Sequence, residues 1–223
     1  MIRNAIYYAG IDTFMDETIW AKAEEILCKE RIEKINKCRQ KEDKMRGLAA
    51  GLLLEYGLRQ YGLSQKMVHF ISYQNGKPGL LEEPGLHFNL THSDRYAAAV
   101  FCDVEAGIDL EHFREQGEKI AARFFAEEEQ TFLKEHMDAS SFTRIWTRKE
   151  SYVKATGEGI KTPFPSFSTV KDVVSQKERE ELFYLKSYDC VPDCWLSVCT
   201  KGREIDFQVE KIDLMTFFAR IKG

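Results

Sequence analysis

GIDLE, at residues 107–111, is the stretch from which the fold of this chain can be worked out. It has the composition of a short strand, and after it the order of predicted elements begins again. In both parts of the chain a strand is followed by helices and then by further strands, which predicts an α+β fold with two similar halves. The predicted elements before it are strands at 6–9, 68–71, 86–90 and 96–101 with helices over 18–61, and those after it are helices over 120–135 and 141–156 with strands near 167–170, 183–188 and 195–199.

Two short stretches near the ends of the halves support this repeat. DRYAAAV (94–100) and DCWLSV (193–198) each place a polar turn before an aromatic residue and then small or β-branched residues. We predict that residues 1–105 and 106–223 form halves related by a pseudo-twofold axis. No Ser/Gly-rich linker separates them, so they are expected to pack as one body. A ligand site is then expected in the cleft between the halves.

Composition favours an ordinary soluble globular protein. Hydrophobic residues make up 43% and charged residues 30% of the 223 residues. No run of about 18 uncharged apolar residues could span a membrane, and the N-terminus lacks a signal-peptide pattern. The six cysteines match no common zinc pattern and indicate reduced structural thiols. We expect a cytoplasmic protein, and the net charge of −4 argues against a general nucleic-acid binder.

Positive charge is concentrated between Lys29 and Arg46. Eight basic and four acidic residues in this stretch leave a local excess of four positive charges. Two interpretations are open: a solvated helix face, or a binding surface for a small, highly anionic ligand.

Two carboxylates in the GIDLE strand are candidates for metal binding. Asp109 and Glu111 lie two residues apart, so both point to the same face of a strand. Such a pair is electrostatically costly unless it is solvated or bridged by a cation, and Mg²⁺ is commonly held by one or two carboxylates. The alternative is an exposed strand end.

The stretch WTRKESYVK (146–154) places three functional groups on one helix face. Trp146, Glu150 and Lys154 are spaced i, i+4 and i+8. Glu150 could complete a carboxylate set or act as a general base, and Lys154 could neutralise a phosphate. The alternative is a surface ion pair worth about 0.3–0.5 kcal/mol.

Two turns carry further polar candidates. In NLTHS (89–93), His92 precedes Ser93, but no Gly-x-Ser-x-Gly elbow is present. A phosphate-binding corner built from the imidazole, a hydroxyl and exposed backbone N–H groups fits better than nucleophilic catalysis. Lys77 lies on a tight Gly-Lys-Pro turn, which could also be only a hairpin connection.

Taken in order, these motifs resemble the longer single-chain class of 4′-phosphopantetheinyl transferases. The resemblance implies transfer of 4′-phosphopantetheine from coenzyme A, the co-substrate, to a serine of an apo acyl or peptidyl carrier protein, with release of 3′,5′-ADP. The motifs are NGKP (75–78), FNLTHS (88–93), GIDLE (107–111), RFF (123–125) with Glu128 and Glu129, and WTRKE (146–150) through Lys154 and Gly157.

The resemblance also implies residue roles. Asp109, Glu111 and Glu150 would hold Mg²⁺ in the second half, and Glu150 would also be the base, directly or through a water. His92 and Lys154 would act at the phosphates, and Glu129 would lie near the metal. The coenzyme A contacts implied, mostly from the first half, are Arg31, Lys34, Arg46, Lys77, His92, Ser93 and Lys154.

Partners and competing functions follow from the same comparison. Carrier proteins are usually acidic around their serine, so Arg114, Lys119 and Arg123 could meet one beside a loop at 112–119. Small carrier-protein synthases build their cleft between subunits, whereas a chain with two halves is expected to be a monomer. Two alternatives are a magnesium-dependent phosphoanhydride hydrolase and a non-catalytic module that binds coenzyme A or carriers.

Overall fold

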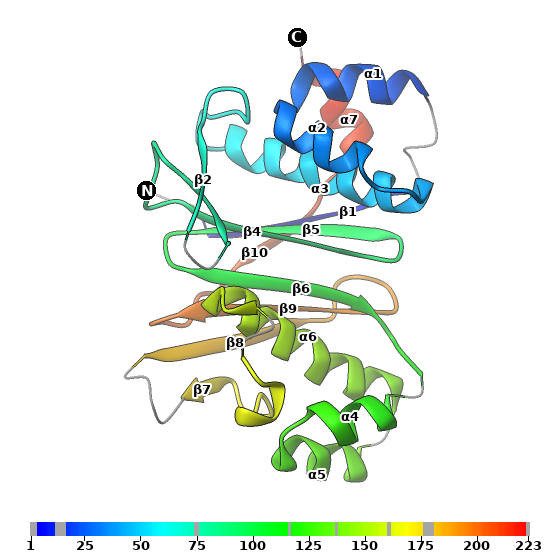
Figure 1. The fold of residues 1–223 in the computed structure, drawn as a ribbon, viewed down its shortest axis with the longest axis vertical. Coiled ribbons are helices and arrows are strands. Elements are labelled where there is room, and N and C mark those ends of the chain that lie inside the picture. Colours follow the sequence, from blue (N-terminus) through cyan, green and yellow to red (C-terminus); the bar gives the residue numbers. More distant parts are fainter. Residues whose placement is uncertain are drawn as a thin grey trace.

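Two four-stranded sheets lie at the centre of the molecule, with helices on the outer side of each (Figure 1). The computed structural model describes residues 4–11, 17–73, 76–115, 117–136, 138–159, 162–175 and 181–221. No helix within these ranges is long and apolar enough to cross a membrane. The six cysteines are all free thiols.

The elements follow the predicted order in both parts of the chain: a strand, then helices, then further strands. The first half contains β1 (Ala5–Gly10), α1 (Glu17–Ile26), α2 (Lys29–Asn36), α3 (Lys41–Arg59), β2 (Phe70–Ser72), β3 (Pro78–Leu80), β4 (His87–Ser93) and β5 (Tyr96–Cys102). The remaining elements are β6 (Ala106–His112), α4 (Glu118–Phe124), α5 (Glu127–Glu135), α6 (Ala139–Thr156), η2 (Phe164–Ser166), β7 (Val173–Ser175), β8 (Leu182–Tyr188), β9 (Cys194–Lys201), β10 (Gln208–Lys211) and α7 (Leu214–Arg220).

Three strands of each sheet share one connectivity. The strand orders are β10-β1-β5-β4 and β6-β9-β8-β7, so β1-β5-β4 of the first sheet corresponds to β6-β9-β8 of the second. The turns before β5 and β9 each hold an aspartate in the left-handed region, Asp94 at φ 47° and Asp193 at φ 55°. These two residues begin the paired stretches noted in the sequence. The α+β fold is confirmed, and the pseudo-twofold axis stays a prediction.

The two halves share one of their cores. Ile6 and Val100 of the first sheet pack against Ile108, Leu196 and Val198 of the second. This shared apolar layer removes surface from water on both sheets at once, which joins the halves into one body.

The C-terminal segment crosses back to the first half. β10 pairs in parallel with β1, and Leu214 and Phe218 of α7 enter the core beneath α1 to α3. Figure 1 shows α7 beside these helices at the top of the molecule. The division at residue 105 stays a prediction, but residues 208–221 pack with the half to which they were not assigned.

The strand predicted near residues 167–170 is wrong. The backbone there is irregular because its polar groups bind buried side chains instead of a neighbouring strand. The Thr169 N–H donates to Glu129 Oε1 at 2.8 Å, and the Thr169 carbonyl accepts from Arg148 Nε at 2.6 Å.

Close packing of β6 on α6 depends on Gly107. A Cβ atom on this residue would lie 2.2 Å from the carbonyl oxygen of Ser151 and 2.3 Å from the backbone nitrogen of Ala155. Only glycine therefore lets the helix backbone approach the strand this closely. The α6 helix starts where Asp138 accepts from the Ser141 N–H at 2.6 Å and ends at Gly157 in the left-handed conformation.

Candidate functional site

Strands from both halves meet the α6 helix at a pocket of about 330 Å³. β4 and β6 are held together there by Asn89, whose Oδ1 accepts from the Ile108 N–H at 3.0 Å. The helix face predicted from the i, i+4, i+8 spacing is confirmed, since all three of its side chains line this pocket. The lining residues are Leu90, Thr91, His92, Asp109, Glu111, Trp146, Glu150 and Lys154.

Asp109 lies at the bottom of the pocket with one satisfied and one unsatisfied oxygen. Its Oδ1 accepts from Lys154 Nζ at 2.7 Å and from Thr91 Oγ1 at 3.1 Å. Its Oδ2 is buried and has no hydrogen-bond partner among the described residues. Burial raises the pKa of Asp109, and the ammonium of Lys154 opposes that rise. A buried carboxylate oxygen without a partner is costly unless a ligand binds it.

Glu111 is the more exposed of the two strand carboxylates. Its Oε2 accepts from Ser93 Oγ at 2.5 Å and from Arg114 Nη2 at 2.8 Å. Ser93 and Arg114, expected at coenzyme A and at the carrier, are therefore engaged with Glu111 in this state.

Glu150 completes a group of three carboxylates. It is half-buried, and among the described residues its carboxylate accepts no hydrogen bond. Its pKa is raised, first by burial and then by the negative charges of Asp109 and Glu111. The negative charges of Asp109 and Glu111 therefore disfavour ionisation of Glu150, an effect that a bound cation would relieve.

The three carboxylates line one pocket but are not arranged as a complete metal site. Within the described residues, no three His, Cys, Asp or Glu side chains are arranged to hold a metal ion. The two strand carboxylates are bound by Lys154, Ser93 and Arg114 instead. The donor chemistry nevertheless fits a hard cation such as Mg²⁺, and the partnerless Asp109 Oδ2 offers it a first ligand.

Cationic groups gather on the β4 side of the pocket. The pKa of His92 is lowered, first by partial burial and then by the charges of Arg46 on α3 and Lys154 on α6. Arg46 is oriented by Asp43 at 2.5 Å and by the carbonyl of Asp94 at 3.2 Å. This arrangement suits an anion that reaches both halves.

Five of the predicted coenzyme A contacts are not among the residues that line this pocket: Arg31, Lys34, Arg46, Lys77 and Ser93. Arg31 packs against α3 at Gly51, and burial lowers its pKa. Lys34 is exposed on α2. Lys77 is buried, and its Nζ donates to the carbonyls of Ala106 at 2.8 Å and Ala155 at 3.2 Å. The first residue of its motif, Asn75, lies outside the described residues.

A larger pocket of about 660 Å³ adjoins the first and was not anticipated from the sequence. The two pockets share Trp146, Glu150 and Lys154. Aromatic and proline side chains from α4 and from the loop after α6 make the new pocket largely apolar, and the closely spaced prolines of that loop were its only sequence signal. Its other lining residues are Gly76, Lys77, Pro78, Asn89, Phe124, Val153, Gly157, Gly159, Thr162, Pro163, Phe164 and Pro165.

The expectation that Glu129 lies near the metal is wrong. Glu129 and Lys149 form an ion pair of 2.7 Å in which both side chains are fully buried. Glu129 also accepts from the N–H and Oγ1 of Thr169, and Lys149 donates to the Phe167 carbonyl at 2.7 Å. The pair joins α5 to α6 on a different face of the helix from Glu150.

Comparison with known proteins points to one family. The model of the 4′-phosphopantetheinyl transferase superfamily matches residues 105–199. The chain is 33% identical to 4′-phosphopantetheinyl transferase Sfp of Bacillus subtilis strain 168 over 75% of this chain and 80% of that protein. A second 4′-phosphopantetheinyl transferase of Bacillus subtilis is 31% identical over 83% of this chain and 89% of its own length. The transferase HetI of Nostoc is 40% identical over 52% of this chain and 51% of that protein.

Proposed function

The chain belongs to the 4′-phosphopantetheinyl transferase superfamily, and from this membership we propose a specific reaction for it. The protein transfers 4′-phosphopantetheine from coenzyme A to the serine hydroxyl of an apo acyl or peptidyl carrier protein. The reaction needs Mg²⁺ and releases 3′,5′-ADP. The observation that carries the proposal is the convergence of Asp109, Glu111, Glu150 and Lys154 on one pocket between the halves.

The metal set of the proposal is Asp109, Glu111 and Glu150. Bound Mg²⁺ would neutralise charge on the pyrophosphate oxygens of coenzyme A. The raised pKa of Glu150 and the partnerless Oδ2 of Asp109 support a cation among these groups. Lys154 and Arg114, which pair with Asp109 and Glu111, would then be available to the substrate phosphates and to the carrier, respectively.

The transfer itself exchanges one P–O bond for another. The serine oxygen of the carrier attacks the phosphorus that bears pantetheine, and the bond from that phosphorus to the bridging oxygen breaks. Glu150 takes the serine proton, directly or through a water, and its raised pKa suits a general base. Lys154 stabilises the negative charge that develops on the departing 3′,5′-ADP.

The nucleotide end of coenzyme A is bound by the cations of the first half. His92, which lines the pocket, and Arg46, whose charge acts on His92, contact phosphate oxygens together with Lys154. Arg31 and Lys34 of α2 extend the positive surface toward the 3′-phosphate. Ser93 donates to a phosphate when it leaves Glu111.

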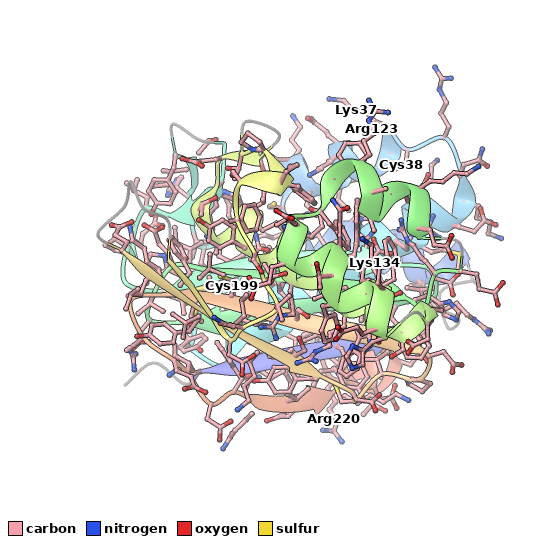
Figure 2. All side chains as sticks on the ribbon, turned by 90° about the horizontal axis from the view of Figure 1, so that it is seen from below. Lys37, Cys38, Arg123, Lys134, Cys199 and Arg220 are labelled. Atoms are coloured by element: carbon pink, nitrogen blue, oxygen red, sulfur yellow. The ribbon has the colours of Figure 1, made fainter. Side chains whose placement is uncertain are left out.

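The carrier docks beside α4. Arg123, labelled in Figure 2, is exposed and lies 5.0 Å over the ring of the exposed Phe124, so this helix offers both charge and apolar surface. Lys119 adds a second exposed cation to it. We further propose that the protein acts as a monomer, because both sides of the pocket come from one chain. We also propose that it is cytoplasmic and binds no nucleic acid, the latter from its net charge of −4.

Intact-protein mass spectrometry of an apo carrier domain tests the proposal. The carrier is incubated with this protein, coenzyme A and Mg²⁺, in parallel with reactions that contain EDTA or the Asp109→Ala variant. Asp206→Ala is a matched control, because this aspartate also pairs with a lysine but is exposed and far from the pocket lining. We expect the carrier to gain one phosphopantetheine, and we expect EDTA and Asp109→Ala, but not Asp206→Ala, to abolish the gain.

Two other outcomes would redirect the assignment. Cleavage of coenzyme A without carrier modification would indicate a hydrolase. Binding of coenzyme A without cleavage, across acyl and peptidyl carriers, would indicate a non-catalytic module.

A further inference from the structure

We propose that Lys77 is a positioning residue for the transfer reaction, one that holds the end of α6 on β6 and so sets the position of Lys154 relative to Asp109. This inference rests on the proposed function. It assigns Lys77 a role other than the nucleotide contact that its motif implies.

The geometry around Lys77 joins three separate parts of the chain. Lys77 precedes β3 in the first half, and its side chain is only 9% exposed. Its Nζ donates to the carbonyl of Ala106, the first residue of β6, at 2.8 Å. It also donates to the carbonyl of Ala155, in the last turn of α6, at 3.2 Å. One ammonium therefore fixes the strand, the helix and the turn against one another.

The ammonium of Lys77 binds beside the close backbone contact between β6 and α6. The strand and helix approach so closely at Gly107 that a Cβ would overlap the helix backbone. The carbonyls of Ala106 and Ala155 are directed to the same point beside that contact, since one donor reaches both. Without it, two buried acceptors would lose a partner, and a buried carbonyl without a partner destabilises the fold. A cation at the C-terminal end of α6 is also favoured by the helix dipole.

The clamped residues adjoin the reacting groups. Ala155 follows Lys154 in α6, and Ala106 lies three residues before Asp109 in β6. The 2.7 Å contact from Lys154 Nζ to Asp109 Oδ1 therefore depends on the relative position of the helix and the strand. A displacement of about 1 Å at a reacting centre can lower the rate by about 10²-fold.

A nucleotide contact and a positioning role predict different kinetic results. A residue that binds the nucleotide changes the affinity for coenzyme A and for 3′,5′-ADP. A residue that sets the position of Lys154 changes kcat far more than those affinities, because Lys154 acts mainly on the charge that develops on the departing 3′,5′-ADP. Lys77 has two carbonyls of the protein interior as partners, which favours the second role.

The test compares Lys77→Met with the wild-type protein and with Leu53→Ala. Leu53 is fully buried in the α3 core, so its variant is a control for lost stability alone. We measure kcat and KM for coenzyme A with an apo carrier, and the Kd of 3′,5′-ADP by calorimetry. For Lys77→Met we expect kcat to fall about 10- to 100-fold with KM and Kd within about twofold of wild type. Leu53→Ala is expected to keep kcat at a temperature where it remains folded.

Hydrogen exchange provides a readout that does not depend on transfer. Lys77→Met should speed exchange of the Gly157 amide, which donates to the Val153 carbonyl at 3.0 Å, relative to amides of α3. If Lys77→Met does not fold, Lys77→Arg replaces it; the larger guanidinium should lower kcat less and again leave Kd unchanged.

Two results would overturn the positioning role: a tenfold weaker Kd at unchanged kcat, or unchanged exchange at the end of α6. A wild-type protein that modifies no carrier would instead contradict the proposed function. The hydrogen-exchange result would still test whether Lys77 holds the end of α6 on β6.

Discussion

The helices α3 and α6 occupy corresponding places in the two halves but bury different kinds of side chain. Each follows the first strand of its half and packs on that half's sheet, and they contain 19 and 18 residues. Residues 48–54 of α3 are all buried and apolar or glycine. The buried residues of α6 include Thr143, Thr147, Arg148, Lys149 and Ser151. The same position in the topology is thus occupied by a core helix in one half and by the helix that bears Glu150 and Lys154 in the other.

The buried polar groups of α6 give it a defined orientation. Thr147 Oγ1 and Ser197 Oγ lie 2.8 Å apart, Arg148 binds backbone carbonyls of 169 and 171, and Lys149 pairs with Glu129. Apolar packing such as that of α3 tolerates small rotations, whereas hydrogen bonds and ion pairs specify direction. The difference indicates that α6 is held on its polar sides so that Glu150 and Lys154 face the pocket.

The largest expected effect is on the transfer rate, and it distinguishes a carboxylate of α6 from one of α3. Glu150→Gln should lower the transfer rate on the order of 10³-fold. It should not lower Tm, because the raised pKa of Glu150 means that its charged form is disfavoured in the fold. Glu55→Gln is the matched change in α3, where the buried carboxylate binds Arg59 and the Gln65 N–H, each at 2.8 Å. It should cost about 1–3 kcal/mol of stability and leave the rate within about twofold.

Carrier-modification rates and thermal unfolding of the two variants check this pair. A Glu150→Gln protein that still transfers at the wild-type rate would contradict the assigned role of that carboxylate.

The next effect concerns the ion pair that orients α6. Lys149→Met should reduce the free energy of unfolding by about 3–5 kcal/mol, because Glu129 would remain buried without its partner. The double change Glu129→Gln with Lys149→Met should recover more than half of that loss. Urea unfolding measures both. Lys186→Met, which removes an exposed pair with Asp206, is the control and should cost about 1 kcal/mol or less. Equal losses in the single and double variants would argue against the pair as the cause.

A smaller effect on stability is expected when a glycine packed against α6 and one inside α3 are each changed to alanine. Gly107→Ala should destabilise the protein by about 1–3 kcal/mol, because the new Cβ would overlap the α6 backbone. Gly47→Ala places a Cβ 3.1 Å from Cγ1 of Ile35, a side chain that can move, and alanine favours the helix. The free energy of unfolding of Gly47→Ala should stay within about 1 kcal/mol of the wild-type value. Urea unfolding measures the stability of both variants. A Gly107→Ala protein as stable as the wild type would show that the strand and the helix need not touch here.

The smallest effect arises at His92, where cations from both helices meet. Burial lowers the His92 pKa from its ordinary value, and the charges of Arg46 of α3 and Lys154 of α6 lower it further, so protonation of the imidazole is disfavoured near neutral pH. Anion binding favours its protonated form, so affinity for 3′,5′-ADP should rise a few-fold as the pH falls toward 6. Calorimetry of His92→Gln should lose this gain, while His69→Gln, a change in an exposed histidine outside the pocket, should keep it. Equal pH dependence in both variants would remove His92 from the anion site.

Local patterns account for the part of the site that could be predicted from the sequence. Asp109 and Glu111 share a strand face, and Trp146, Glu150 and Lys154 share a helix face, because the periods of 2 and 3.6 residues act within a few positions. The irregular segment at 167–170 was mistaken for a strand because its apolar and hydroxyl residues resemble one. Its backbone groups bind side chains about 20 to 40 residues away, which no local pattern reveals.

The sequence by itself determined the α+β fold, the repeated order of elements, the family and the faces that carry the reacting groups. Only the tertiary structure decided which charged side chains are used inside the protein. Lys77 and Lys149 resemble other lysines in the sequence, yet one binds carbonyls 29 and 78 residues away and the other a carboxylate on a neighbouring helix. A buried charge must find a partner or lose its ionisation, and that partner is supplied by packing between distant segments.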